Sequence, residues 1–248
     1  MDTTTTALSP TFEIQRANER AFADHGWLKT YHSFSFADYF DPANLSWGAL
    51  RVFNDDTVAG GTGFGTHPHR DMEILTYVLS GELEHKDSMG NVGVVGAGGV
   101  QYLSAGTGIS HSEYNHQPDA AVRLVQMWVL PRAQHLSPQY GQVDYTAADR
   151  DNRWLPIASG IAAIPSRIEI FADAACFVAG LHEKRLVRRF EDGRHGFLFV
   201  ASGTVEANGK TLAEGDAVRL IGPCELAVEG TAELVVWDVA ALGAARGR

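Results

Sequence analysis

ILTYVLSGELEHKDSMGN (residues 74–91) predicts two short β-strands separated by turns. Residues 74–79 form an apolar run of the length expected for a strand that is buried on both faces. The Ser-Gly pair at 80–81 indicates a turn or bend, and the Met-Gly-Asn triplet at 89–91 is typical of the turn that closes a hairpin. This stretch therefore predicts β-structure and not an amphipathic helix.

Similar short apolar segments recur along the first half of the chain. They include LRVFNDD (50–56), VQYLSAG (100–106) and VRLVQMWVL (122–130), and they alternate with turn signals from the 26 glycines of the sequence. Helical periodicity is weak before residue 130, whereas strand-length segments bounded by turn residues are frequent. We therefore predict an all-β protein.

An internal repeat indicates that one β-unit occurs twice. Residues 77–84, YVLSGELE, and residues 199–206, FVASGTVE, share an aromatic residue, two apolar residues, a Ser-Gly pair, a polar residue, an apolar residue and Glu. The segments that follow, 92–106 and 209–223, also match in their glycine and valine positions. Two copies about 120 residues apart predict two small tandem barrels.

The repeat and the composition of the intervening chain predict three regions. Residues 1–131 are predicted to form an N-terminal barrel, which carries His67, His69, His111 and Glu113 as candidate metal ligands. Residues 151–248 are predicted to form a C-terminal barrel, which has no second histidine pair at the equivalent positions and is expected to bind no metal. Residues 132–150 are polar, contain Pro138 and Gly141, and are predicted to be a linker.

Charge and hydropathy exclude several classes of partner. Thirty acidic residues against twenty basic ones give a formal net charge of −10, which argues against direct binding to nucleic acid. No apolar run reaches the roughly 20 residues that cross a bilayer, and no basic, apolar leader opens the chain, so we expect a cytoplasmic monomer. Cys176 and Cys224 are expected to be reduced packing residues. A small organic substrate or a protein partner fits this composition.

Two pairs of candidate metal ligands have the spacing of residues on one face of a strand. His67 and His69 are two residues apart, as are His111 and Glu113, and side chains two apart on a strand point to the same side. A closed barrel brings two such pairs to one interior point. Three imidazoles and one carboxylate suit a first-row divalent metal with positions left for water, substrate or dioxygen.

Other residues near the motifs have competing interpretations. Glu73 follows His69 by four residues and could also face inward. The remaining seven histidines have no comparable partner in the sequence and are expected at the surface or in the core: His25, His32, His85, His116, His135, His182 and His195. Six aromatic residues could line a pocket for a flat ring system, although most are expected to be barrel core: Phe53, Phe64, Tyr77, Tyr102, Tyr114 and Trp128.

The same residues resemble the two sequence motifs of cupins. Those that match the first motif are Gly61, His67, His69, Glu73 and Gly81, with one extra residue before the last glycine. Those that match the second are Gly108, His111 and Asn115, with Gly106 where that motif usually has proline. Longer stretches resemble pirin, the bicupin family that includes bacterial quercetin 2,3-dioxygenases: GWLKTYHSFSFADYFDP (26–42), LRVFNDD, HPHRDMEILTYVLSGELEHKDSMGN and SAGTGISHSEYN.

The resemblance to pirin implies a fold, a site and an activity. The fold is two tandem cupin barrels, each a double-stranded β-helix or jelly roll. The metal ligands are His67, His69, His111 and Glu113, and Glu73 lies just behind the ligands or at the pocket wall. The metal is a divalent transition ion, with iron first and nickel, copper, cobalt, manganese or zinc as alternatives.

The implied activity is oxygenase chemistry on a small aromatic substrate. With O2 as co-substrate, the enzyme opens the central ring of a flavonol such as quercetin and releases carbon monoxide. Glu113 is the predicted catalytic residue, because it can take the proton of the flavonol 3-hydroxyl group when a divalent cation makes that group acidic. The alternatives are a redox-sensing regulatory protein that binds a protein partner, and an inert scaffold with a fortuitous metal.

Overall fold

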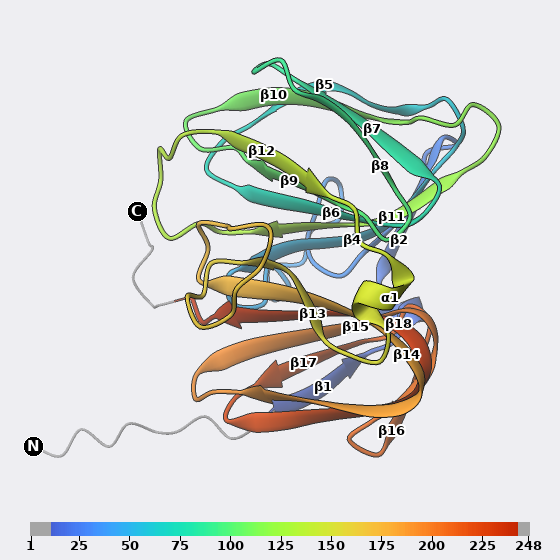
Figure 1. Cartoon of the computed structure of the whole chain (residues 1–248), viewed down its shortest axis with the longest axis vertical. Coiled ribbons are helices and arrows are strands. Elements are labelled where there is room, and N and C mark those ends of the chain that lie inside the picture. The colour runs from blue at the N-terminus through green and yellow to red at the C-terminus, as the bar shows by residue number, and fades with distance from the viewer. Residues whose placement is uncertain (1–10, 243–248) are drawn as a thin grey trace, which may run out of the picture.

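The computed structural model describes residues 11–242, and nearly every regular element in this part of the chain is a β-strand (Figure 1). The N-terminal barrel consists of two sheets, whose strand orders are β12-β9-β6-β11-β4-β3-β2 and β5-β10-β7-β8. The strands of the first sheet are β2 (Ala21–Asp24), β3 (Leu28–His32), β4 (Leu50–Val58), β6 (Glu73–Ser80), β9 (Val100–Ser104), β11 (Val122–Val129) and β12 (Gln139–Val143). Those of the second are β5 (Gly63–His69), β7 (Glu82–Asp87), β8 (Val92–Gly96) and β10 (Ile109–Asn115).

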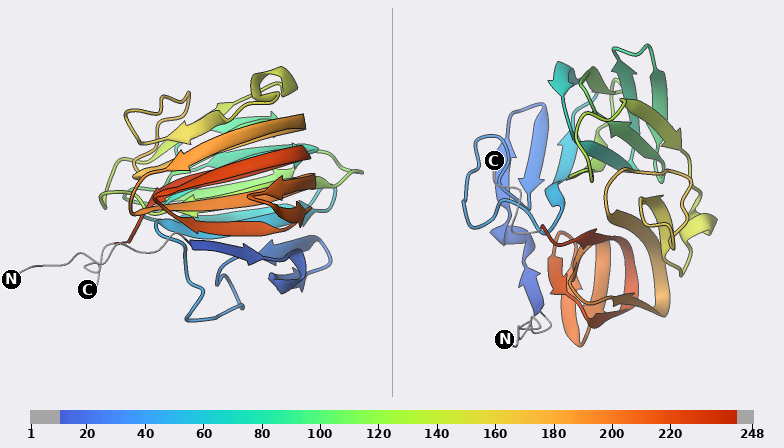
Figure 2. Two further views of the ribbon diagram at one scale, coloured as in Figure 1. Left: turned by 90° about the horizontal axis from the view of Figure 1, so that it is seen from below. Right: turned by 90° about the vertical axis from the view of Figure 1, so that its left-hand side faces the viewer.

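The C-terminal barrel is a third sheet, in the order β1-β17-β15-β18-β14-β13, with β16 paired to β15. Its strands are β1 (Thr11–Gln15), β13 (Leu155–Ser159), β14 (Ala174–Phe190), β15 (Arg194–Ala207), β16 (Lys210–Ala213), β17 (Ala217–Ile221) and β18 (Cys224–Ala240). A short 3-10 helix, η1 (Ala17–Glu19), and one turn of α-helix, α1 (Ala147–Arg150), complete the described elements. The two barrels lie against each other in Figure 1 and in the right-hand view of Figure 2. The prediction of an all-β protein with two cupin barrels is confirmed.

Equivalent hydrogen bonds confirm the internal repeat. In the N-terminal barrel the backbone N–H of Gly98 donates to the carbonyl of Val78 at 2.8 Å. In the C-terminal barrel the N–H of Gly215 donates to the carbonyl of Val200, also at 2.8 Å. The same two backbone groups therefore meet in both copies.

The Ser-Gly pair of each copy marks a close approach of two backbones. Gly81 and Gly203 have φ of +81° and +82°, a region that residues with a Cβ rarely adopt. A Cβ on Gly81 would lie 2.9 Å from the Cα of Val122, and one on Gly203 would overlap the carbonyl oxygen of Thr231. Both glycines therefore let the chain pass close to a neighbouring segment, at Val122 for Gly81 and at Thr231 for Gly203.

The strand pairing differs from the three predicted regions, which were 1–131, 132–150 and 151–248. β1 pairs with β17, so the first described strand belongs to the C-terminal barrel. β12, inside the predicted linker, pairs with β9 and forms the edge of an N-terminal sheet. Its sequence QYGQV is polar, as is common for an edge strand, which has a partner strand on one side only. A polar edge strand is hard to distinguish from a loop by composition, so β12 was predicted to be part of a linker.

One apolar core continues from one barrel into the other. The rings of Phe53 and Phe199 lie 4.9 Å apart across the boundary, and the indole N–H of Trp237 contacts the sulfur of Met127 at 3.0 Å. Cys176 is buried in this core and, like Cys224, forms no disulfide, as predicted. No helix among residues 11–242 is long and apolar enough to cross a membrane.

We predict that Gly203→Ala destabilises the protein more than Gly209→Ala. Both glycines have positive φ, so both substitutions carry backbone strain of about 1–2 kcal/mol. Only the Cβ at position 203 would overlap a neighbouring strand, because nothing lies within 4 Å of a Cβ at position 209. Urea unfolding measures the difference in the free energy of unfolding. Equal losses of unfolding free energy in both variants would contradict the close approach of the Gly203 and Thr231 backbones.

Candidate metal centre

Three histidines from two paired strands meet inside the mouth of the N-terminal barrel. β5 carries His67 and His69, and β10 carries His111 directly opposite His67. The ring centroids are 4.5 Å apart for His67 and His111, 4.9 Å for His69 and His111, and 4.7 Å for His67 and His69. One ring nitrogen of each lies within 4.8 Å of the others, a spacing that one metal ion can bridge.

Glu113 lies in a second group that shares His111. The β5–β10 register shifts between His111 and Glu113, and on its other side Glu113 stands opposite His85 of β7. Ligand atoms of His85, His111 and Glu113 lie within 4.8 Å of one another, and all three residues are buried. The structure therefore places the predicted carboxylate beside His111 and His85.

The Glu113 carboxylate accepts three side-chain hydrogen bonds. Gln126 Nε2 donates to one oxygen at 2.8 Å, and Gln101 Nε2 and Thr76 Oγ1 donate to the other at 3.0 and 3.3 Å. Burial raises the pKa of this carboxyl above its usual range, and the nearby His85 and His67 side chains and the hydrogen bonds from Gln126 and Thr76 offset part of that shift. A buried carboxylate with a raised pKa is a stronger proton acceptor than an exposed one.

The free ring nitrogens fit a metal ion. His67 Nδ1 lies 2.8 Å from the carbonyl of Gly65, so this nitrogen carries the proton and Nε2 has a free lone pair. His111 Nε2 is buried and has no hydrogen-bond partner within residues 11–242. An unpartnered buried nitrogen costs about 1–3 kcal/mol, and a cation that binds it would remove this cost.

Burial also keeps two of the imidazoles neutral. Desolvation, with a contribution from the neighbouring His67, lowers the pKa of His69 to about 4. Desolvation and the neighbouring histidines lower the pKa of His111 to about 3. Since a metal binds only the unprotonated ring, these two ligand candidates are ready to bind at neutral pH.

Sequence reasoning did not assign His85 to the site. His85 is fully buried, and its Nε2 lies 3.1 Å from Asp87 Oδ2 while its Nδ1 accepts from Gln101 Nε2 at 3.0 Å. The alternation of Leu83, His85 and Asp87 along β7 is the signal that could have identified it, because it places the histidine on the inward face of a hairpin strand.

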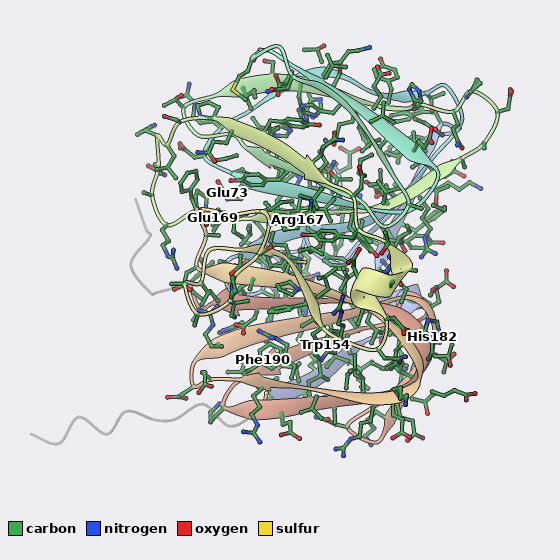
Figure 3. All side chains as sticks on the ribbon, viewed as in Figure 1. Glu73, Trp154, Arg167, Glu169, His182 and Phe190 are labelled. Carbon is green, nitrogen blue, oxygen red and sulfur yellow. The ribbon has the colours of Figure 1, made fainter. Side chains whose placement is uncertain are left out.

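The structure corrects the predicted position of Glu73. This carboxylate does not line the pocket but lies between the barrels, at the lower face of the N-terminal barrel in Figure 3. It accepts hydrogen bonds from Tyr102 Oη at 2.6 Å, Ser104 Oγ at 2.7 Å and the backbone N–H of Phe171 at 3.0 Å. The intervening residues include Asp71 with φ +48°, a turn that breaks the alternation that starts at His69.

Aromatic rings lie next to the histidine cluster. Trp128 packs edge-on against His69 with centroids 4.8 Å apart, and Phe36 packs against Trp128 at 5.4 Å. Phe64 lies 6.5 Å from His67. Of the six predicted aromatic residues, Phe64 and Trp128 thus lie at the site, Tyr114 is exposed, and the other three belong to the core: Phe53, Tyr77 and Tyr102.

Comparisons with known proteins cover both barrels. The family model described as Pirin matches residues 14–129, and the one described as Quercetinase C-terminal cupin domain matches residues 165–239. A quercetin 2,3-dioxygenase of Escherichia coli K12 is 39% identical over 230 residues, or 91% of this chain and 97% of that protein. A pirin-like protein of Caulobacter vibrioides is 42% identical over 221 residues, or 88% and 95%. The crystal structure of the bacterial pirin YhhW from E. coli in complex with nickel(II) has a TM-score of 0.87 and 36% identity, and the match covers 94% of this chain and 100% of that one.

We predict that the metal-free protein loses stability as the pH falls from about 6.5 toward 4. In this range the unfolded chain protonates its histidines, whereas folded His69 and His111 stay neutral, so protons favour the unfolded state. His111→Gln should reduce this pH dependence, and the exposed His116→Gln should not. Urea unfolding in the presence of a chelator, at pH 7.5 and pH 5, tests both variants, and equal pH dependence in wild type and His111→Gln would refute the assignment.

Proposed function

Because the chain belongs to the pirin family, we propose that it is a metal-dependent dioxygenase that opens the central ring of a flavonol such as quercetin with O2. One flavonol and one O2 would give one depside and one carbon monoxide. The observation that carries the proposal is the buried, unpartnered Nε2 of His111 beside His67 and His69. The quercetin 2,3-dioxygenase name of the E. coli relative supports the substrate class.

Four residues of the site would bind the metal, and one of them, Glu113, would also accept a proton. His67, His69 and His111 would bind the metal through their free nitrogens, with Glu113 as the oxygen ligand on the inner side. We propose iron first, and nickel, copper, cobalt, manganese or zinc as alternatives; the relative YhhW has been crystallised with nickel(II). When bound, the metal supplies a positive charge that makes the flavonol 3-hydroxyl group acidic.

Glu113 would accept the proton of that hydroxyl group. Its oxygens stay in a fixed position through the donors Gln101 and Gln126, and its raised pKa favours proton uptake from an acidic hydroxyl group at neutral pH. Loss of the proton makes the flavonol electron-rich, the form that reacts with O2. The rings of Phe36, Phe64 and Trp128 would bind the flat substrate.

We predict that Glu113→Gln lowers flavonol turnover by roughly 10²–10⁴-fold, because the amide cannot accept the hydroxyl proton. Glu73→Gln is the matched control, since Glu73 is an equally buried carboxylate of the same barrel that points away from the histidines. The loss of flavonol absorbance in air, divided by the metal content from elemental analysis, gives turnover per bound metal.

Two outcomes would contradict the catalytic proposal. Unchanged turnover per metal in Glu113→Gln would remove Glu113 as the proton acceptor. A wild-type protein that binds metal but consumes none of a panel of flavonols and catechols would refute the dioxygenase activity. In that case the regulatory alternative, tested by capture of a protein partner, would be favoured.

A further inference from the structure

The Asp87 carboxylate has a fixed position at the end of β7. Its Oδ1 accepts the backbone N–H groups of Met89 at 2.9 Å and Asn91 at 3.0 Å, both in the turn that closes the β7–β8 hairpin. Asn91 Nδ2 donates to Oδ2 at 2.9 Å. Oδ2 thus retains one further acceptor direction, and His85 Nε2 lies there at 3.1 Å.

The proton on His85 can be assigned from its neighbours. Gln101 Nε2 contacts both Glu113 Oε1 and His85 Nδ1 at 3.0 Å, and an amide nitrogen can only donate. His85 Nδ1 must therefore accept, and the proton of the neutral ring is on Nε2, which faces Asp87. Both ring nitrogens of His85 are engaged by protein groups, so this residue does not offer a free lone pair to a metal.

The same assignment determines the proton on His111. His111 Nδ1 lies 3.5 Å from His85 Nδ1, at the limit of a hydrogen bond. Since His85 Nδ1 carries no proton, the two nitrogens attract each other only if His111 carries its proton on Nδ1, and this N–H then shares the single lone pair of His85 Nδ1 with Gln101 Nε2. The lone pair of His111 is then on Nε2, the buried atom without a partner.

We propose that Asp87 and His85 are positioning residues of the metal centre, which fix the tautomer of His111 and the amide orientation of Gln101. This inference rests on the metal site of the proposed function. Metal-binding histidines commonly donate their second ring nitrogen to a carboxylate, which orients the ring. In this protein a second histidine stands between the carboxylate and the candidate ligand, and the same histidine also directs a donor to Glu113.

Asp87→Asn is the sharpest test, because it should reverse the direction of the hydrogen bonds that run from His111 through His85 to Asp87, which we call the proton chain. The hairpin N–H groups require an oxygen at one position of the side chain, so the new NH2 group would take the position of Oδ2. There it would face His85 Nε2 and also Asn91 Nδ2, whose amide would have to turn. His85 would then carry its proton on Nδ1, where it would oppose the N–H groups of Gln101 and His111.

Two further variants separate positioning from packing. His85→Phe removes both nitrogens but keeps a ring that can stack on Tyr140, whose ring centroid lies 4.3 Å away. Tyr140→Phe is the matched control, because it changes the same ring stack and removes only a hydroxyl group that donates to Gln142, outside the proton chain. Circular dichroism and thermal unfolding establish that each variant is folded.

The probe is cobalt(II), with its affinity measured by competition with a chromophoric chelator and its ligand geometry by visible absorption. We expect Asp87→Asn and His85→Phe to bind cobalt roughly 10–100-fold more weakly than wild type, with altered spectra, and Tyr140→Phe to match wild type. If His85→Phe does not fold, Asp87→Asn decides the question alone.

Three results would overturn the inference. Asp87→Asn with the wild-type affinity and spectrum would show that the chain does not position the ligands. Cobalt loss in His85→Phe as complete as in His111→Ala would make His85 itself a ligand. Absence of cobalt binding by wild type would refute the metal centre as a whole. Cobalt binding with the expected variant effects but without flavonol turnover would support the positioning role and refute only the proposed substrate.

Discussion

The candidate metal centre depends on the pairing of β10 with β5 along one edge and with β7 along the other. Alternation along β10 turns His111 and Glu113 toward the barrel interior, where they are 1% and 2% exposed. β5 then brings His67 opposite His111, and β7 brings His85 opposite Glu113. A shift of one residue in either register would turn the facing side chains to the outside, so register alone determines whether the site exists.

The internal repeat shows how one β-unit supports two different interiors. In the equivalent strands β6 and β15, Tyr77 and Phe199 point outward and pack in the core that both barrels share. The residues before them point inward: Thr76 donates to Glu113, whereas Leu198 belongs to an apolar cluster. The outward face thus keeps the two barrels together, and at this position the inward side chain is polar in the N-terminal copy and apolar in the C-terminal copy.

Strand alternation predicted much of the centre because it is a local property. The turn at residues 88–91, which closes the β7–β8 hairpin, and the shared face of His67 and His69 follow from local sequence signals. Glu73 was misplaced because the turn at Asp71 changes which face the next strand presents, and spacing does not reveal backbone φ. The alternation along β7 could place His85 on the inward face, but it does not show that Gln101 of β9 and Glu113 of β10, which are distant in sequence, lie beside it. The pairings of β1 with β17 and of β12 with β9 also join segments that are distant in sequence, so no local pattern predicts them.

Glu113 connects the two sheets of the N-terminal barrel. It lies on β10 of the four-stranded sheet, while its donors Thr76, Gln101 and Gln126 come from β6, β9 and β11 of the seven-stranded sheet. Buried charged groups persist only when such donors compensate their desolvation. The position of the Glu113 carboxylate relative to the histidines on β5 and β10 is therefore determined by how the two sheets pack. The shared core holds β6 and β11 against the second barrel, so the C-terminal barrel can influence the geometry of the centre through packing.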